Sequence, residues 1–459
     1  MQPVKKGEIN LPAFSVLIMM SSIIDVSSQV VGIRNDSIYT QLRQKIQFIP
    51  LVDSHCHIPA PSTVQQRFAD KSFKYDILWV LCKSTYVAEF IYGSNWEETK
   101  KALQINAHHA YYRPILEAFR ELYGLPRTEE LNDNNVELVS ARMDSAHRQS
   151  GWQDEVIKRA NVSQILWVIN EPLTKTEAPA PYYHIVWNID ALVYVTGATE
   201  NKETKEKSYN IDTVQKNFSV TFKSLTDFVA FMQEKITNFF TNGGVGLKTT
   251  SAYFRALDFN DAVPREEAVR VFDKVLRHQP VSAPEQKTLE DYLMTQILSL
   301  AAKHKKPFQF HTGNQQGWSI VSHSNPLGLN ALLYSGKWYE VKFILLHGGY
   351  PYIEESVMLS KYYKNVYLDL AWMALYSPSA ARRALSDAID MLDGRQLMFG
   401  TDTANLEEFY GTAKFIRTIL AEVLAEKIAS GFLTEEIALQ IARRILSTNA
   451  LELYEIDTE

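Results

Sequence analysis

Eight short apolar runs constrain the fold of this 459-residue chain more than any other feature. They are rich in β-branched and aromatic residues, and most of them end in a polar residue followed by a loop. They lie at residues 50–57, 162–170, 184–195, 243–250, 307–313, 341–349, 366–372 and 397–403. Continuous apolar runs of this length are typical of strands that are buried on both faces of a sheet.

Segments with the apolar spacing of helices separate several of these runs. Examples are residues 324–339, 353–365 and 377–394. Alternation of strand and helix predicts a parallel sheet. We therefore predict an α/β fold, a distorted (β/α)8 TIM barrel, which commonly takes about 250 residues plus insertions.

The surplus length falls outside these alternating units. Residues 48–455 are expected to form the barrel, preceded by an N-terminal arm at residues 1–47. Residues from about 60 to 160 lie between the first and second strands and have helical spacing, which predicts a helical cap near the top of the barrel. The polar stretch 196–210 predicts a surface loop, and residues 258–300 a further extension.

Composition and charge exclude several kinds of partner. Hydrophobic residues make up 46% of the chain and charged residues 22%, which is ordinary for a soluble globular enzyme. The formal net charge is −6 and the basic residues are scattered, so nothing favours a nucleic acid. No apolar run reaches the roughly 20 residues needed to span a bilayer, so no membrane partner is expected.

The cysteines and the N-terminus bear on location. Two cysteines, Cys56 and Cys82, fit a reducing compartment, and we predict a cytoplasmic protein. The apolar residues after Lys5 and Lys6 look loosely like a signal peptide. Because Glu8 interrupts the basic region and no clear cleavage site follows, we favour an arm packed on the barrel and keep export as the alternative.

Side chains suited to catalysis recur at the ends of the predicted strands. In a barrel of this type the active site lies at the carboxyl ends of the strands. The polar residues at those ends are His55 and His57 on strand one, Lys248 on strand four, His311 on strand five, His347 on strand six and Asp402 on strand eight. Their recurrence at corresponding positions carries more weight than the His-x-His pair alone.

The pair His55 and His57 is the first candidate for metal binding. Alternate residues of a strand point the same way, so both imidazoles can face one ion. Imidazole and carboxylate are suitable ligands for Zn2+ and comparable divalent ions. The competing interpretation is a polar strand end without metal, which the matching residues on the later strands make the weaker one.

Five motifs together resemble those of the amidohydrolase superfamily. They are VDSHCH, GLKTTSAYFRAL, FQFHTG, FILLHGGYPY and FGTDT, in that order along the chain. The resemblance is closest to the amidohydrolase 2 branch, which includes uronate isomerases, decarboxylases of the aminocarboxymuconate-semialdehyde type and nodulin-like or FluG-like domains. It covers about residues 48 to 455, and the insertion after the first strand is similar to that of the uronate isomerases.

The resemblance implies a role for each matching residue. His55, His57, His311 and Asp402 would be the metal ligands, and Asp402 would also take a proton from the metal-bound water. His347 would polarise the substrate or the water. The implied cofactor is one divalent metal ion, with Zn2+ favoured over Mn2+ or Fe2+.

The sequence leaves more than one role open for the remaining candidate site residues. Lys248 would either meet a substrate anion or, less favoured, carry a carboxylate that bridges two metal ions. Arg255 could hold a substrate carboxylate in bidentate fashion, and Arg113 could reach the substrate from a cap helix. Trp372 could line the pocket. Histidines without motif context, such as His147, are expected at the surface.

These expectations favour a metal-dependent hydrolase. It would act on a C–N or C–O bond of a small, carboxylate-bearing substrate through a metal-activated water. The alternatives are a uronate isomerase-like isomerase or a non-oxidative decarboxylase with the same metal site, and a non-enzymatic scaffold that kept the fold. The partner is a small molecule, and a homo-oligomer is left open.

Overall fold

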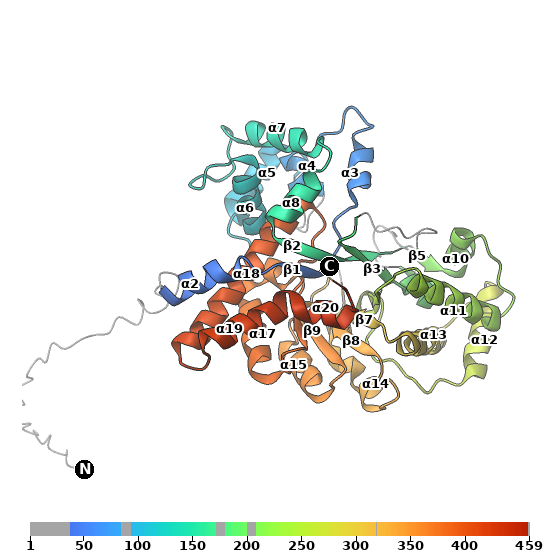
Figure 1. Cartoon of the computed structure of the whole chain (residues 1–459). Coiled ribbons are helices and arrows are strands. Elements are labelled where there is room, and N and C mark those ends of the chain that lie inside the picture. The colour runs from blue at the N-terminus through green and yellow to red at the C-terminus, as the bar shows by residue number, and fades with distance from the viewer. Residues whose placement is uncertain (1–36, 84–92, 171–179, 200–207, 318, 458–459) are drawn as a thin grey trace, which may run out of the picture.

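Eight parallel strands curve into a nearly closed barrel, which confirms the predicted (β/α)8 fold (Figure 1). The computed structural model describes residues 37–83, 93–170, 180–199, 208–317 and 319–457. Along the sheet the strands are β1 (Leu51–Cys56), β2 (Val162–Ile169), β3 (Tyr183–Asn188), β6 (Gly246–Thr249), β7 (Pro307–Phe310), β8 (Lys342–Leu345), β9 (Val366–Asp369) and β10 (Leu397–Met398). Seven of the eight apolar runs contain one of them completely, and β3 begins at Tyr183, one residue before the third run.

The segment that follows β10 closes the barrel onto β1. The backbone N–H of Asp402 donates to the carbonyl of His55 at 2.8 Å, and that of His57 donates to Thr403 at 3.0 Å. Below them, the Asp53 carboxylate accepts the backbone N–H of Thr401 at 2.7 Å. These bonds join residues that are far apart in sequence and place Asp402 beside the two histidines of β1.

Both faces of the strands are buried, which explains their continuous apolar sequences. In β7, Phe308 and Phe310 belong to the large core shared with the outer helices, whereas Ile344 of β8 belongs to a smaller cluster inside the barrel. Tyr454, the last residue of α20 (Asn449–Tyr454), is fully buried in that inner cluster. The chain end therefore fills one end of the barrel and leaves the other for the polar strand ends.

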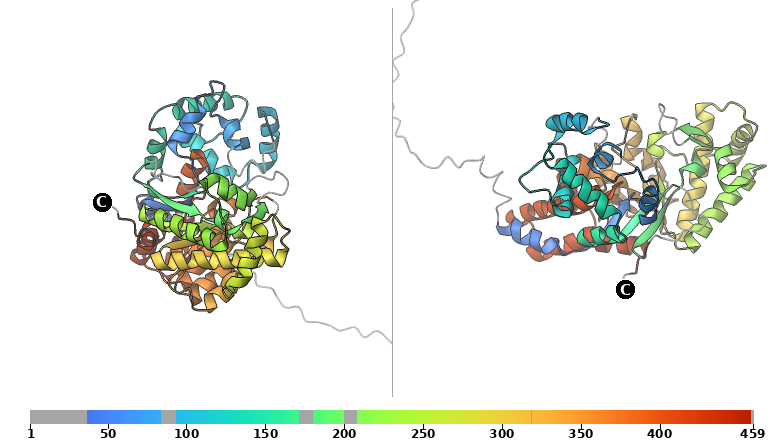
Figure 2. Two further views of the ribbon diagram at one scale, coloured as in Figure 1. Left: turned by 90° about the vertical axis from the view of Figure 1, so that its right-hand side faces the viewer. Right: turned by 90° about the horizontal axis from the view of Figure 1, so that it is seen from above.

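Among the described residues between β1 and β2 there are six helices, whose buried side chains form a core that also includes Trp372 and Leu375. The views of Figures 1 and 2 show them gathered on one side of the molecule, away from α10 (Ile211–Phe218) and its neighbours. They are α3 (Pro61–Arg67), α4 (Ile77–Lys83), α5 (Trp96–Asn106), α6 (Tyr112–Tyr123), α7 (Val136–His147) and α8 (Trp152–Arg159).

The expectation that His147 lies at the surface is wrong. Its ring stacks on Tyr75 with 3.5 Å between centroids, and its Nε2 lies 2.8 Å from the carboxylate of Glu407. Tyr123 donates to the same carboxylate at 2.5 Å. His147 thus joins the cap to the barrel helix that carries Glu407, a contact between distant segments that no local pattern indicates.

The other helices surround the barrel and the N-terminal helix packs on two of them. Helix α2 (Ser37–Ile46) lies against α18 and α19 and buries Leu42 and Ile46. The surrounding helices are α11 (Leu225–Thr241), α12 (Arg265–Leu276), α13 (Ala283–His304), α14 (Asn330–Tyr334), α15 (Ile353–Tyr362), α16 (Met373–Tyr376), α17 (Pro378–Met391), α18 (Leu406–Ala429) and α19 (Glu435–Arg443).

The secondary structure differs from the prediction in two segments. The third apolar run is not one strand, because β3 ends at Asn188 and a short helix α9 (Asp190–Val193) follows. The polar stretch expected as a surface loop contains an antiparallel pair, β4 (Thr196–Thr199) with β5 (Ser208–Asn210). Both departures are local ends of elements, where propensity is weakest as a guide.

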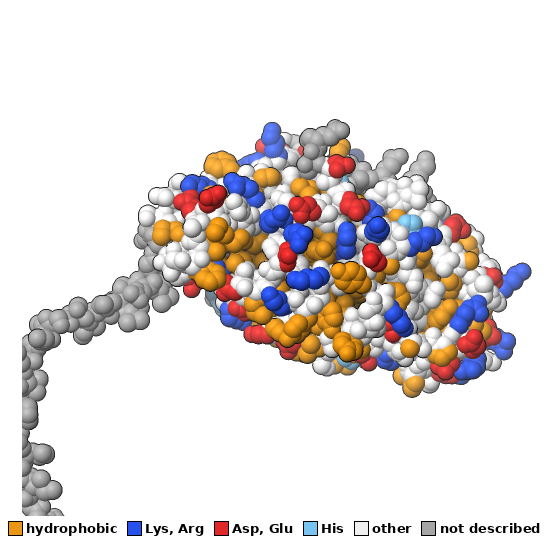
Figure 3. Space-filling model, turned by 60° about the horizontal axis from the view of Figure 1, so that its bottom comes forward, with side chains coloured by type: hydrophobic (Ala, Val, Ile, Leu, Met, Phe, Trp, Pro, Cys, Tyr) orange, Lys and Arg blue, Asp and Glu red, His pale blue; other side chains and the backbone are white. Residues whose placement is uncertain are grey.

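The surface shown in Figure 3 carries interspersed charges of both signs, with no continuous basic stripe across that face. Among the described helices, none is long and apolar enough to cross a bilayer.

Gly411 of α18 generates a test of how closely the cap approaches the barrel. A Cβ placed on Gly411 would lie 1.9 Å from the carbonyl oxygen of Pro114 in α6. We expect Gly411→Ala to lower the free energy of unfolding by about 1–3 kcal/mol, because the two helices must separate. Urea denaturation measures this change.

Gly394→Ala is the matched control, because the nearest atom to its added Cβ would be 3.8 Å away on Arg444. It should leave the unfolding free energy within about 0.5 kcal/mol of the parent. Equal stability of the Gly411 variant and this control would contradict the close contact of α6 with α18.

Candidate metal centre

One cavity of about 180 Å³ at the carboxyl ends of the strands collects most of the candidate residues. Seven of the nine residues predicted for the site line it. The lining comprises His55, His57, Val168, Asn170, Asn188, Lys248, Thr250, Tyr253, His311, Gln316, His347, Trp372 and Asp402.

His55, His57 and Asp402 converge on one point. The Nε2 atoms of the two histidines are 3.2 Å apart. Oδ1 of Asp402 lies 3.3 Å from Nε2 of His57 and 3.5 Å from Nε2 of His55. Two ligands at about 2.1 Å from one tetrahedral ion are themselves about 3.4 Å apart, so these three spacings fit a shared metal ion.

An irregularity in β1 turns both histidines toward the cavity. Val52 belongs to the cluster inside the barrel, whereas Cys56, an even number of residues later, belongs to the outer core. Strict alternation would put both on the same side. The pairing with β2 shifts register between Asp53 and Cys56, and such bulges commonly redirect side chains near active sites.

Gln309 of β7 determines the tautomer of His55. Its amide nitrogen donates to the carbonyl of Ser54 at 3.1 Å and to the hydroxyl of Tyr454 at 2.7 Å. The amide oxygen therefore faces Nδ1 of His55, at 2.8 Å, and accepts its proton. This leaves the Nε2 lone pair of His55 pointing at His57 and Asp402, as a metal ligand requires.

His311 and His347 face each other across the cavity. Nε2 of His311 lies 2.8 Å from the carbonyl of Asn314, and Nδ1 of His347 lies 3.0 Å from that of Ala371. A carbonyl only accepts, so these nitrogens carry the protons and the inner nitrogens, 3.0 Å apart, present lone pairs to each other.

Two lone pairs at this distance favour a cation beside them. Burial holds the pKa values of His311 and His347 well below their usual range, so a proton is a poor occupant. Imidazole nitrogens are good ligands for divalent metals. The pair therefore adds two candidate donors to the site, and His347 also lies within 4.8 Å of the donor atoms of His55 and Asp402.

Asp402 combines two properties of a metal-binding base. Burial raises its pKa to about 7, although Lys248 lowers it. Its Oδ1 is buried and accepts no hydrogen bond from any described residue. An orphaned buried carboxylate oxygen is costly unless a cation compensates it. The donor set and this oxygen together fit a divalent ion.

Lys248 lies against the same group. Its Nζ is 3.3 Å from Nε2 of His55, and the side chain is almost completely buried. Burial lowers its pKa to about 8, against the opposite influence of Asp402. The ammonium is thus poised to lose its proton more readily than a surface lysine.

Three residues at the mouth have left-handed backbones. His347, Trp372 and Asp402 have φ values of 64°, 71° and 51°. Such conformations cost non-glycine residues of the order of 1 kcal/mol or more, and they cluster at functional sites where the surroundings enforce them. They place three lining side chains at the ends of β8, β9 and β10.

Neutral polar groups that the sequence did not single out as site residues also line the cavity. Asn170 and Asn188 follow β2 and end β3, and the amide nitrogen of Asn188 donates to the oxygen of Asn170 at 3.2 Å. Thr250, Tyr253 and Gln316 are the others. The sequence could have indicated these two asparagines, because each is a polar residue at the end of an apolar strand.

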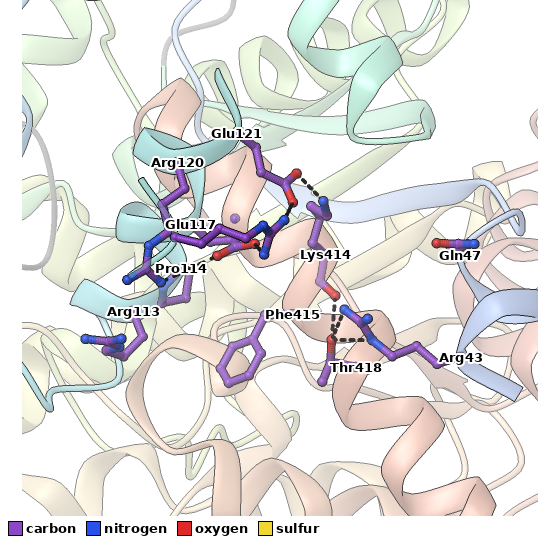
Figure 4. Close-up of a pocket in the computed structure, with 12 residues that line it drawn as sticks. Arg43, Gln47, Arg113, Pro114, Glu117, Arg120, Glu121, Lys414, Phe415 and Thr418 are labelled. Carbon is purple, nitrogen blue, oxygen red and sulfur yellow. Dashed lines mark hydrogen bonds and ion pairs between the residues drawn. The ribbon is translucent and has the colours of Figure 1, made fainter. Parts of the chain in front are cut away.

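The two arginines predicted to bind substrate do not line this cavity. Arg255 is turned toward helix α13, where it pairs with Asp291 at 2.8 Å and with Glu290 at 3.3 Å. Arg113 pairs with Glu130 at 2.9 Å and lines a different cavity, drawn in Figure 4. Carboxylates from other segments pair with both guanidinium groups, and Lys248 is the one lysine or arginine among the described residues of this lining.

Comparison with known proteins supports the resemblance of the motifs. Residues 250–456, somewhat less than half of the chain, match the family model described as Amidohydrolase. This segment contains His311, His347 and Asp402. Protein fluG of Emericella nidulans is 25% identical over 453 residues, which is 92% of this chain. The chain spans about half, 47%, of that relative's length.

Solved structures share the fold. A uronate isomerase from Thermotoga maritima has a TM-score of 0.74 at 15% identity and covers 91% of this chain and 97% of its own. A glucuronate isomerase from Caulobacter crescentus has a TM-score of 0.72 at 14% identity, with coverage of 92% and 95%. The resemblance to the amidohydrolase superfamily that the motifs predicted is confirmed.

The contact between Gln309 and His55 generates a test that needs no substrate. Gln309→Leu removes the acceptor that fixes the His55 tautomer, and we expect the affinity for Zn2+ to fall by about 10–100-fold. Competition with a chromogenic chelator measures the affinity.

Gln164→Leu is the matched control. Gln164 makes a similar contact with His184, 2.7 Å long, on β2 and β3, outside the cavity lining. Its zinc affinity should match that of the parent. An unchanged affinity in Gln309→Leu would show that this amide does not orient the ligand.

Proposed function

We propose that this amidohydrolase-like chain is a metal-dependent hydrolase that cleaves a C–N or C–O bond in a small carboxylate-bearing molecule. The observation that carries the proposal is the convergence of His55 Nε2, His57 Nε2 and Asp402 Oδ1 at mutual distances of 3.2 to 3.5 Å. These residues, together with His311, would hold one divalent ion, for which Zn2+ is the best match to the nitrogen and oxygen donors.

When bound, a divalent ion in such a site lowers the pKa of a water ligand toward about 7 and polarises a substrate carbonyl. Asp402 would receive the proton that is released, because its Oδ1 lies beside the two histidines that would hold the ion. Asp402 can then return the proton to the leaving group.

Lys248 and His347 act on the substrate in this proposal. Among the described residues that line the cavity, Lys248 is the one with a basic side chain of the lysine or arginine type. It would attract the substrate carboxylate, because Arg255 and Arg113 do not line this cavity. His347, held by the Ala371 carbonyl, would polarise the reacting group. Trp372 would give the cavity an apolar wall. The size of the cavity, about 180 Å³, favours a small substrate.

A second candidate reaction uses the same residues. Two of the fold neighbours are isomerases of uronates and glucuronate, and the sequence resemblance implies a similar insertion, which favours isomerisation of a sugar acid. A non-oxidative decarboxylation is the third chemistry open to the site. The presence of both His311 and His347 favours hydrolysis or decarboxylation over isomerisation.

Product mass separates these reactions. Incubation with N-acyl amino acids, lactones and sugar acids should yield products whose summed mass exceeds the substrate by one water if the enzyme is a hydrolase. An unchanged mass would support the isomerase, and release of CO2 would support the decarboxylase.

The two free cysteines support a cytoplasmic location for this reaction.

Asp402→Asn tests the catalytic assignment. The amide cannot take a proton, so turnover should fall by at least about 100-fold while the far-ultraviolet circular dichroism stays that of the parent. Asp133→Asn, at an exposed cap position, is the control and should retain activity. Full activity of the Asp402 variant would refute the role of this residue.

Metal removal tests the cofactor. We expect chelation to abolish turnover and Zn2+ to restore it, with elemental analysis giving one ion per chain. Two ions per chain, with Lys248→Met reducing the count to one, would instead support the carboxylated-lysine alternative. Full turnover by metal-free protein would overturn the proposal.

A further inference from the structure

A second and larger cavity, of about 530 Å³, shares no lining residue with the metal centre. Its walls come from the cap helix α6, the barrel helix α18 and the N-terminal helix α2, and Figure 4 shows Phe415 between the side chains of α6 and those of Arg43 and Thr418. The lining comprises Arg43, Gln47, Arg113, Pro114, Glu117, Arg120, Glu121, Arg127, Gly411, Lys414, Phe415 and Thr418.

The two acidic residues of this cavity are already paired. Arg127 lies 3.1 Å from Glu117 and 2.8 Å from Glu121. Lys414 forms an ion pair with Glu121, and Tyr410 donates to the same carboxylate at 2.6 Å. Burial raises the pKa of Glu121, but the hydrogen bonds from Lys414 and Tyr410 bring it down to about 2. Glu121 is therefore ionised at neutral pH, and its negative charge is balanced by the cations that contact it.

The other cations are less completely neutralised. Arg113 and Arg120 share the carboxylate of Glu130, outside the lining, at 2.9 and 3.6 Å, and Arg120 also lies 3.8 Å from Glu117. Nε of Arg120 is buried and donates to no described atom. Arg43 donates from Nε and Nη2 to the neutral hydroxyl of Thr418, at 3.3 and 3.2 Å, and has no carboxylate partner among the described residues.

The charge count leaves a positive surplus. Five of the lining residues are Lys or Arg and two are Glu, and inclusion of Glu130 still leaves an excess of two positive charges. A concave surface with charges of one sign concentrates the field and attracts anions. Guanidinium groups match phosphate oxygens in bidentate geometry, and their remaining N–H donors need acceptors.

We propose that this cavity binds a small phosphate-bearing molecule, whose phosphate lies between Arg43 and the arginines of α6. The volume is within the range of small-ligand sites. Phe415 offers an apolar surface for an organic part of the ligand.

Binding there would hold together three parts of the chain that are separate in sequence. Helix α2 precedes the barrel, α6 belongs to the cap, and α18 begins at Leu406, four residues after Asp402. The ligand would relieve repulsion among the like charges that these helices bring together. The inference does not depend on the chemistry at the metal centre.

Isothermal titration calorimetry of the full chain with AMP, pyrophosphate and adenosine tests the proposal. AMP or pyrophosphate should bind, more weakly as salt is raised, and adenosine should not. Tighter binding of AMP than of pyrophosphate would identify an organic phosphate as the ligand class, and the reverse would identify an inorganic one.

Arg43→Gln locates the binding site. Arg43 is exposed and pairs with a hydroxyl, so the substitution should leave the fold intact. Phosphate affinity should fall by about ten-fold or more, the effect of losing a charged hydrogen bond. Arg395→Gln is the control and should bind like the parent, because Arg395 is exposed and its ion pair among the described residues is with neighbouring Asp393.

Asp402→Asn separates this cavity from the metal centre. Binding of AMP or pyrophosphate should persist in that variant if the ligand occupies the larger cavity. Three results would overturn the proposal: no heat with either phosphate, affinity in Arg43→Gln equal to that of the control, or binding that is lost in Asp402→Asn.

Discussion

The closure of the barrel between β1 and the segment after β10 is the constraint on which the site depends. Two backbone hydrogen bonds, from Asp402 to His55 and from His57 to Thr403, fix the distance between the first and last of the candidate metal ligands. Gly400 allows this approach, because a Cβ there would lie 2.8 Å from the backbone nitrogen of His55. The same bonds that complete the fold therefore set the spacing of the candidate metal ligands.

Burial of the polar and charged side chains of the site destabilises the folded protein and favours the binding of a cation there. Four imidazoles, a lysine and a carboxylate share one cavity, with lone pairs of His311 and His347 turned toward each other. Burying such groups costs free energy unless an ion compensates them. The hydrogen bonds of Gln309, Asn314 and Ala371 to the outer nitrogens keep the inner ones available to a cation.

The cap connects this chemistry to the rest of the molecule. Its buried His147 pairs with Glu407 at the start of α18, and Gly411 lets α6 approach the same helix closely. Beside these contacts the helices diverge and form the larger cavity, where arginines gather. Helix α18 thus lies between the two cavities, beginning next to the ligand Asp402 and carrying Lys414 and Thr418 two to three turns later.

The sequence by itself determined the barrel and the chemical identity of the candidate ligands. The eight apolar runs and the polar residues that end them are local patterns, and the parallel fold brings such strand ends together whatever the details. Tertiary structure alone decided which charges remain available. Arg255 and Arg113 have the chemistry to bind a carboxylate, but Asp291 and Glu130, from other helices and loops, pair with them first. Gln309 looked like one polar residue in a strand, and only the packed barrel shows that it orients His55. Ion pairs and tautomers depend on contacts between distant residues, and residue spacing along a chain carries no information about them.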